Sequence, residues 1–165
     1  MTARRAIAGA VAALALLLAG CGGGSSDIAL TTADTSRPDR VAAAFAAAFA
    51  GGDTPLACTY AGGNAKARMS AGGDSSLCSR SAWSGQGYWL DHQCVTPAYG
   101  NNPAVYTFIY RTNGQVGGGD SFVADVTGAD RAWQVTSYVA GPTSQTGQLC
   151  AIVESVYPSP TAASS

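Results

Sequence analysis

TSRPDRVAAAFAAAFAGGD, residues 35–53, contains the clearest helix signal in the chain and decides the first layer of the fold. Ser36 stands where it can cap the amide of Asp39, and Pro38 falls in the first turn, where its missing N–H costs nothing. The pair Gly51-Gly52 ends the pattern. Three large apolar residues recur at a spacing of four and therefore share one face: Val41, Phe45 and Phe49. We predict a helix whose aromatic stripe packs into the core.

Two helices that each carry a cysteine are predicted next along the chain. Asp53 can cap the segment TPLACTYA, which contains Cys58, and Asp74 can cap SSLCSRSAW, which contains Cys78. A brief turn is expected between them, over residues 64–69. The Gly-rich stretch around this turn lacks the G-K-[ST] ending of a phosphate-binding loop, so its glycines indicate loops.

From Gly87 onward the apolar residues alternate with period two, which is typical of β-strands. In the segment of residues 104–112 we expect Tyr106, Phe108 and Tyr110 to share one face. Hairpin turns are predicted at Asn113-Gly114 and at the stretch TGAD. The predicted strands are GYWLDHQCV, AVYTFIYRT, DSFVADVTG and RAWQVTSYVA, residues 87–95, 104–112, 120–128 and 131–140.

The last two predicted strands carry apolar faces as well. On the third, alternation places three residues together: Phe122, Ala124 and Val126. On the fourth, three residues mark one side: Trp133, Val135 and Val139. Helices followed by an antiparallel meander predict an α+β fold, with the N-terminal helices packed on one face of a curved sheet. The stretch GQLCAIVESVY, residues 147–157, fits either a last strand or a short helix.

The first 20 residues have the three parts of an export signal. Arg4 and Arg5 supply a positive flank, residues 6–18 form an apolar run, and Ala19-Gly20 provides small residues before a cleavage point. The run is shorter than the stretch of about 20 residues that a membrane-spanning helix needs. We therefore expect cleavage instead of a permanent membrane span.

The segment Leu18-Ala19-Gly20-Cys21 resembles the lipobox of bacterial lipoproteins. The resemblance implies that Cys21 carries a diacylglycerol and becomes the first residue of the mature chain. It also implies acylation of the new amine by a fatty acid such as palmitate. Several acyl chains on one residue anchor a protein stably. The expected location is thus the extracytoplasmic face of the cell membrane.

Composition divides the chain into a signal, a tether, one domain and a tail. Gly22 to Ser26 have the composition of a flexible linker. The remaining length suits one domain of ordinary size. The assignment is a signal peptide over residues 1–20, a tether over 21–36, a single α+β domain over 37–157 and a disordered tail over 158–165.

Four cysteines remain once Cys21 is set aside, and an even number in an exported chain predicts disulfides. We favour two particular pairs because the first would join helices and the second would tie a strand to the C-terminus: Cys58–Cys78 and Cys94–Cys150. The cysteines lie far apart and His92 is the only histidine, so the sequence predicts no metal site and no cofactor. The mature chain is mildly acidic, with no basic stripe, so nucleic acid is not an expected partner.

The order of elements resembles the nuclear transport factor 2-like, or cystatin-like, cone fold of many small bacterial lipoproteins. The residues that carry the likeness are the first helix ending FAGGD, the helix PLACTY, the third helix and the closing AWQVTSYV, which together span Arg37 to Val139. The resemblance implies a pocket between the sheet and the helices. We predict that its lining includes Tyr106, Phe108, Tyr110 and Trp133, although such residues also suit a filled core.

Some members of that fold family are enzymes, such as ketosteroid isomerase and the SnoaL-type cyclases, and the likeness implies proton transfer by a carboxylate or histidine. The candidates here are Asp91 and His92. In a regular strand these neighbours point to opposite faces, so only one of them can reach a pocket. Arg111 and Asp125 are expected to pair across strands.

Three functions follow as hypotheses from these patterns. The leading one is a noncatalytic, lipid-anchored envelope protein that binds a small apolar ligand or a protein partner. The second is a SnoaL-like small-molecule enzyme that uses Asp91 or His92. The third is a structural or interaction module with a filled core. An enclosed cavity facing Asp91 or His92 would favour the enzyme.

Overall fold

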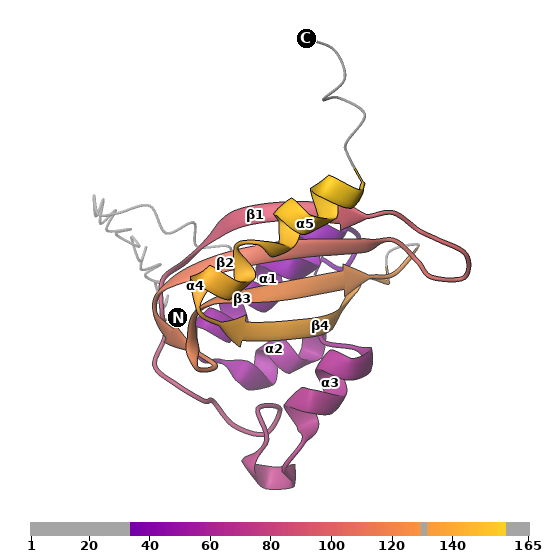
Figure 1. Ribbon diagram of the computed structural model, residues 1–165. Coiled ribbons are helices and arrows are strands. Elements are labelled where there is room, and N and C mark those ends of the chain that lie inside the picture. Colours follow the sequence, from indigo (N-terminus) through magenta and orange to yellow (C-terminus); the bar gives the residue numbers. More distant parts are fainter. Residues whose placement is uncertain (1–33, 130–131, 158–165) are drawn as a thin grey trace, which may run out of the picture.

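The computed structural model describes residues 34–129 and 132–157, and it has an α+β fold built in three layers. Helices α1 to α3 lie on one face of a four-stranded antiparallel sheet, and α4 and α5 lie on the other (Figure 1). The predicted signal peptide, the lipidation residue Cys21 and the predicted tail lie outside the described residues. No helix of the described part is both long and apolar enough to cross a membrane.

Helix α1 (Pro38–Ala50) lies where the sequence predicts it and ends before Gly51, whose N–H bonds to Ala47 O at 2.9 Å. The predicted Ser36 cap is wrong. The N-cap residue is Arg37, without a side-chain cap, and the Ser36 N–H donates instead to Asp34 Oδ1 at 3.1 Å. The predicted core face is confirmed, since its three large residues are fully buried: Val41, Phe45 and Phe49.

The sheet is a simple meander in which each strand pairs with the next along the chain, in the order β1-β2-β3-β4. This order leaves β1 and β4 at the two edges. The strands are β1 (Tyr88–Thr96), β2 (Val105–Val116), β3 (Gly119–Thr127) and β4 (Gln134–Gly141). The face toward α1 is called the inner face below, and the face toward α5 the outer face.

The β2–β3 turn lies at Gly117-Gly118 and not at the predicted Asn113-Gly114. Both turn glycines have positive φ, +58° and +93°, as two-residue hairpin loops of the favoured type require. Asn113 lies within β2, where its Oδ1 accepts the N–H of Gly87 at 2.8 Å. The turn therefore lies four residues after the predicted position, at a Gly-Gly pair instead of the Asn-Gly pair.

A β-bulge at Thr136 reverses which side chains of β4 point to the inner face of the sheet. Val126 pairs with Val135, and Asp125 pairs with Ser137, so Thr136 is an extra residue. Val135 is consequently buried while Val139 is half exposed. The prediction that these two valines share a side is wrong, because strict alternation does not survive an inserted residue.

The inner core is filled by aromatic rings. Phe49 of α1 lies at its centre, with its ring centroid 5.1 Å from that of Phe122 and 5.4 Å from that of Tyr138. The ring of Trp83 packs edge-on against it at 5.0 Å, and Tyr110 stacks on Phe122 at 5.2 Å. The alternation predicted for β2 and β3 is confirmed by these inward-facing rings.

Helix α2 (Thr54–Tyr60) begins as predicted, with Asp53 Oδ1 accepting the N–H of Leu56 at 3.1 Å. It is followed by α3 (Gly63–Ser70), in place of the brief turn that was expected. The predicted disulfide between Cys58 and Cys78 is present, with Cα atoms 5.3 Å apart.

The predicted helix around Cys78 is wrong. Only the short 3₁₀ turn η1 (Gly73–Ser75) forms there, followed by further turns. Serine hydroxyls provide the reason: Ser76 Oγ and Ser79 Oγ lie 2.9 Å apart, and Ser79 Oγ donates to Gly73 O at 3.0 Å. Such local bonds compete with the helical hydrogen-bond pattern.

The segment that the sequence left undecided forms α5 (Leu149–Val156), preceded by the single turn α4 (Thr143–Thr146). Cys150 of α5 joins Cys94 of β1 in the second predicted disulfide, with Cα atoms 5.5 Å apart. Ile109, Val123 and Val153 surround this bond in a small core on the outer face. The disulfide thus lies at the centre of the contact between α5 and the sheet.

Candidate functional site

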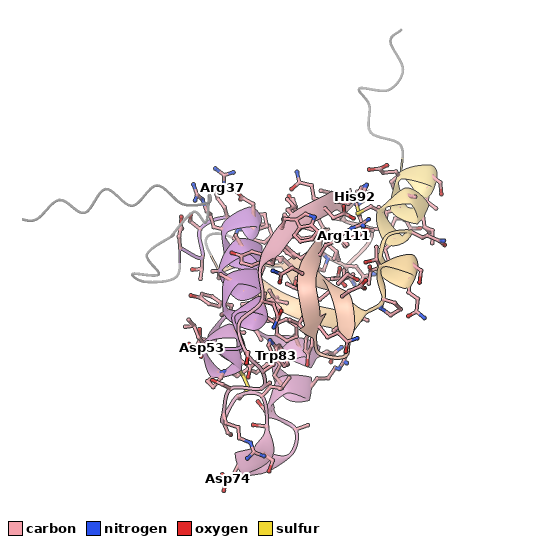
Figure 2. All side chains as sticks on the ribbon, turned by 90° about the vertical axis from the view of Figure 1, so that its left-hand side faces the viewer. Arg37, Asp53, Asp74, Trp83, His92 and Arg111 are labelled. Carbon is pink, nitrogen blue, oxygen red and sulfur yellow. A yellow bond between two sulfur atoms is a disulfide. The ribbon has the colours of Figure 1, made fainter. Side chains whose placement is uncertain are left out.

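A cavity of about 510 Å³ opens at the edge strand β1, between the start of α1 and the end of α5. Arg37, Pro38 and Asp39 border it from α1, and Glu154 and Tyr157 border it from the C-terminal segment. Its sheet wall comes from β1 and β2: Gln93, Cys94, Val95, Tyr106 and Phe108. Figure 2 places Arg37 at the same end of the molecule as the end of α5, opposite Asp74.

The four aromatic residues of the predicted pocket do not stay together. Tyr106 and Phe108 line this cavity. Trp133 is not among the residues that line the cavity, but its ring packs edge-on against the Tyr106 ring, with centroids 5.3 Å apart. Tyr110 lies in the filled inner core, where burial raises the pKa of its phenol.

The cavity has an apolar wall and a charged rim. The side chains of Tyr106 and Phe108 face the inner side of the sheet, opposite Val95 and Gln93 of β1 in the strand register. At the rim, Arg37 Nε lies 2.9 Å from Asp39 Oδ1. Its volume falls in the range of about 300–1,000 Å³ that is usual for small-molecule sites.

Asp91, His92 and Arg111 form a separate cluster on the outer face. Asp91 Oδ2 lies 2.9 Å from Arg111 Nε and 3.1 Å from His92 Nδ1. The Asp91 side chain is 17% exposed and that of His92 is 57% exposed. Figure 2 shows His92 and Arg111 side by side between the sheet and α5.

A β-bulge produces this cluster. Leu90 pairs with Tyr110 and His92 pairs with Ile109, so Asp91 is the extra residue. The prediction that Asp91 and His92 point to opposite faces is therefore wrong, since it assumed a regular strand. Neither residue lines the cavity between α1 and α5.

The pKa of Asp91 reflects two opposed effects. Burial disfavours the charged carboxylate, but contact with the Arg111 guanidinium and the His92 imidazole outweighs it and holds the pKa of Asp91 below its usual value. The carboxylate is thus charged at neutral pH, which makes it an orienting group for His92 and a poor proton donor.

The expected pair between Arg111 and Asp125 does not form. Arg111 forms an ion pair with Asp91 instead, and Asp125 Oδ1 accepts a hydrogen bond from the hydroxyl of Thr107 at 2.7 Å. The strand register explains this outcome, because Asp125 lies directly opposite Thr107 and Arg111 opposite Ser121. Asp125 also borders a smaller outer-face groove of about 370 Å³ beside α5.

Neither a scan against protein-family models nor searches of curated proteins and solved structures finds a match to this chain. Within residues 34–129 and 132–157, no three His, Cys, Asp or Glu side chains gather as metal ligands would. The geometry of the cavity and the N-terminal sequence are therefore the features that bear on function.

Sequence patterns identified two of the ten residues that line the cavity. The alternation in β2 indicated Tyr106 and Phe108, but nothing in the sequence indicated Arg37, Glu154 or Tyr157. These residues come from the two ends of the domain and meet only because α5 crosses the outer face to reach β1. The position of Cys150 was the one available signal, since its bond to Cys94 brings the C-terminal segment to that edge.

Proposed function

We propose that the chain is a lipid-anchored, extracytoplasmic envelope protein that binds a small, largely apolar molecule in the cavity between α1 and α5, without catalysis. The observation that carries the proposal is the open cavity of about 510 Å³ walled by Tyr106 and Phe108. The aromatic wall suits an apolar body, and the charged rim suits a polar end that stays near solvent.

The anchor is supported by the sequence of the N-terminus. The segment Leu18 to Cys21 stands at the end of an apolar run, as in lipoprotein precursors, and the other four cysteines are paired. Paired cysteines are typical of proteins outside the cytosol. Both features agree with an exported domain that is held at a membrane.

The enzyme hypothesis has weaker support. Asp91 orients His92 in a way that suits a general base, but the imidazole lies on the exposed outer face and away from the cavity. Acid–base catalysis needs a bound substrate within hydrogen-bond reach of the base. A binding protein requires only the cavity.

The ligand is tested by native mass spectrometry of the protein purified from its own membranes. We expect a co-purifying small molecule that is lost from Val95→Trp, because an indole at this position of the wall fills the cavity. Leu90→Trp is the matched control: it is an exposed residue of the same strand that does not line the cavity, so recovery should be unchanged. Equal recovery from both variants, or an empty wild-type protein, would contradict the binding proposal.

The anchor is tested separately by Cys21→Ser. We expect this variant to accumulate as an uncleaved precursor or to leave the membrane fraction, whereas intact-mass analysis of the wild type should show a lipid on residue 21. A wild-type chain with a free thiol at Cys21 would remove the anchor and leave the binding result standing.

A further inference from the structure

A groove of about 370 Å³ lies on the outer face of the sheet, along helix α5, which crosses this face (Figure 1). We call it the α5 groove. All four strands contribute to its floor, and α5 contributes its wall. The α5 groove shares no lining residue with the cavity beside β1. Its lining residues are Thr96, Val105, Thr107, Val123, Asp125, Val139, Leu149, Ile152 and Val153.

The lining of the α5 groove is mostly aliphatic and partly open to solvent. Val139 is 49% exposed, Leu149 is 40% exposed and Ile152 is 58% exposed, whereas Val123 of the floor is buried. None of the described residues that line the groove carries an aromatic ring. The surface thus suits an alkyl chain, and it lacks the rings with which aromatic cages hold quaternary ammonium groups.

Asp125 brings a negative charge into this aliphatic surface. The residue is half-buried, and its Oδ1 accepts a hydrogen bond from the Thr107 hydroxyl at 2.7 Å. Within residues 34–129 and 132–157, no other donor bonds to the carboxylate, and no Lys, Arg or His side chain pairs with it. A half-buried carboxylate attracts a cation more strongly than one in open water, because solvent screens it less.

Arg111 does not supply the counter-charge, although it belongs to the same strand as Thr107. Its guanidinium pairs with Asp91 at 2.9 Å. Arg111 also lies four residues along β2 from Thr107, roughly 13 Å at the rise of a β-strand. The charge of Asp125 is therefore left for a ligand to neutralise.

We infer that the α5 groove is a second binding site, for a small primary aliphatic amine in its protonated form. The ammonium group pairs with Asp125 and donates a further hydrogen bond to Thr107 Oγ1, which keeps its lone pairs because its own hydrogen is directed at Asp125. The alkyl chain lies along the aliphatic residues of β4 and α5. This site goes beyond the proposed function and depends neither on the lipid anchor nor on the cavity beside β1.

The test is an NMR titration of the purified, isotopically labelled full chain with hexylammonium chloride. We expect saturable shifts of amide signals around Asp125 and in α5. Asp125→Asn keeps an acceptor for Thr107 but removes the charge, so it should weaken binding by about tenfold. Asp74→Asn is the matched control, because it removes the same charge from an exposed residue at the far end of the molecule (Figure 2) and should leave the affinity unchanged.

Ligands of altered chemistry test the two parts of the site separately. 1-Hexanol has the same chain without the charge and should bind about tenfold more weakly than hexylammonium. Butylammonium should bind about fourfold more weakly, because an open groove buries each methylene only in part.

A second variant tests the position of the ammonium group. Val139 lies diagonally across the β3–β4 register from Asp125, so Val139→Lys provides an ammonium from the protein itself and should block hexylammonium binding. Val139→Met is the control, since it lengthens the side chain without adding charge and should weaken binding far less.

Four results would overturn the inference. The first is the absence of saturable shifts. The second is equal affinity of Asp125→Asn and the wild type, or of 1-hexanol and hexylammonium, since the charge would then play no part. The third is loss of binding in Val95→Trp, which would place the amine in the cavity beside β1. The fourth is tighter binding of Nα-acetyl-lysine amide than of hexylammonium, which would assign the groove to a lysine of a partner protein.

Discussion

Asp91 and Arg111 form an ion pair in which the partly buried carboxylate oxygen lies 2.9 Å from the guanidinium Nε. Both atoms are shielded from solvent, and the contact is not a linear hydrogen bond, so their attraction is chiefly electrostatic. The pair joins the edge strand β1 to β2 at the bulge.

Arg111→Ala is therefore expected to lower the free energy of unfolding by about 1 kcal/mol or less near neutral pH. The pKa of Asp91 is lowered in the folded state, so the stability it contributes is present above the ordinary value of 3.8 and is lost as pH falls through the folded value. Urea unfolding of both proteins should show a difference at neutral pH that disappears in acid. Arg37→Ala, which breaks an exposed pair, is the control with a smaller effect. If the wild type and Arg111→Ala differed in unfolding free energy by the same amount at both pH values, the loss would not come from the charged Asp91 carboxylate.

Phe49→Ala should cost about 3–5 kcal/mol, because its ring contacts four others and the helix cannot collapse into the space it leaves. Chemical denaturation monitored by tryptophan fluorescence measures this loss, since Trp83 packs on the same ring. Tyr99→Ala, at a residue that is 81% exposed, should leave stability nearly unchanged. Comparable losses from both substitutions would be inconsistent with a core centred on Phe49.

Some of these structural features could be predicted from the sequence and others could not. The α1 face and the alternation of Tyr106, Phe108 and Tyr110 were predictable because regular periodicity carries them. The even number of cysteines predicted two disulfides, and the positions of the cysteines along the chain favoured the pairing. The extra residues Asp91 and Thr136 were not predictable, since a bulge leaves no mark in the pattern of apolar residues. The cluster around Asp91 was missed for that reason.

Replacing Cys94 and Cys150 together by alanine should free α5 while the inner core stays folded. The small outer core is built around this disulfide, so little apolar contact remains to hold the helix. Hydrogen exchange should rise over residues 149–156 and stay low in α1. The expected loss of stability is about 4 kcal/mol on the chain-entropy model. Retained protection of α5 would show that the bond is not what holds it.

The pair Cys58–Cys78 closes a shorter loop, and its replacement by alanine should cost about 3 kcal/mol on the same model. Its structural effect should differ, because the bond ties the turns around Cys78 to α2. Hydrogen exchange is expected to rise over residues 71–83 and to stay unchanged in α5. The reverse pattern would show that the two bonds do not act locally.

Tyr110 gives a prediction at alkaline pH. Burial raises the pKa of its phenol in the folded protein, so its contribution to stability is present below the ordinary value of 10.0 and is lost as pH rises further. Tyr110→Phe should unfold at higher pH than the wild type, as followed by circular dichroism during an alkaline titration. Tyr138→Phe offers a comparison, since the pKa of Tyr138 is also raised by burial although Arg68 lies over its ring. An unchanged alkaline midpoint for Tyr110→Phe would place its hydroxyl in contact with water.

The bond between Cys94 and Cys150 closes a loop that contains the end of β1 and all of β2, β3 and β4. A protease that cuts the β1–β2 connection, residues 97–104, would cleave the backbone without releasing a fragment. The cut would open this loop, but both halves would stay joined through the disulfide until a thiol reductant breaks it. In an environment rich in secreted proteases, such a bond keeps a nicked domain in one piece.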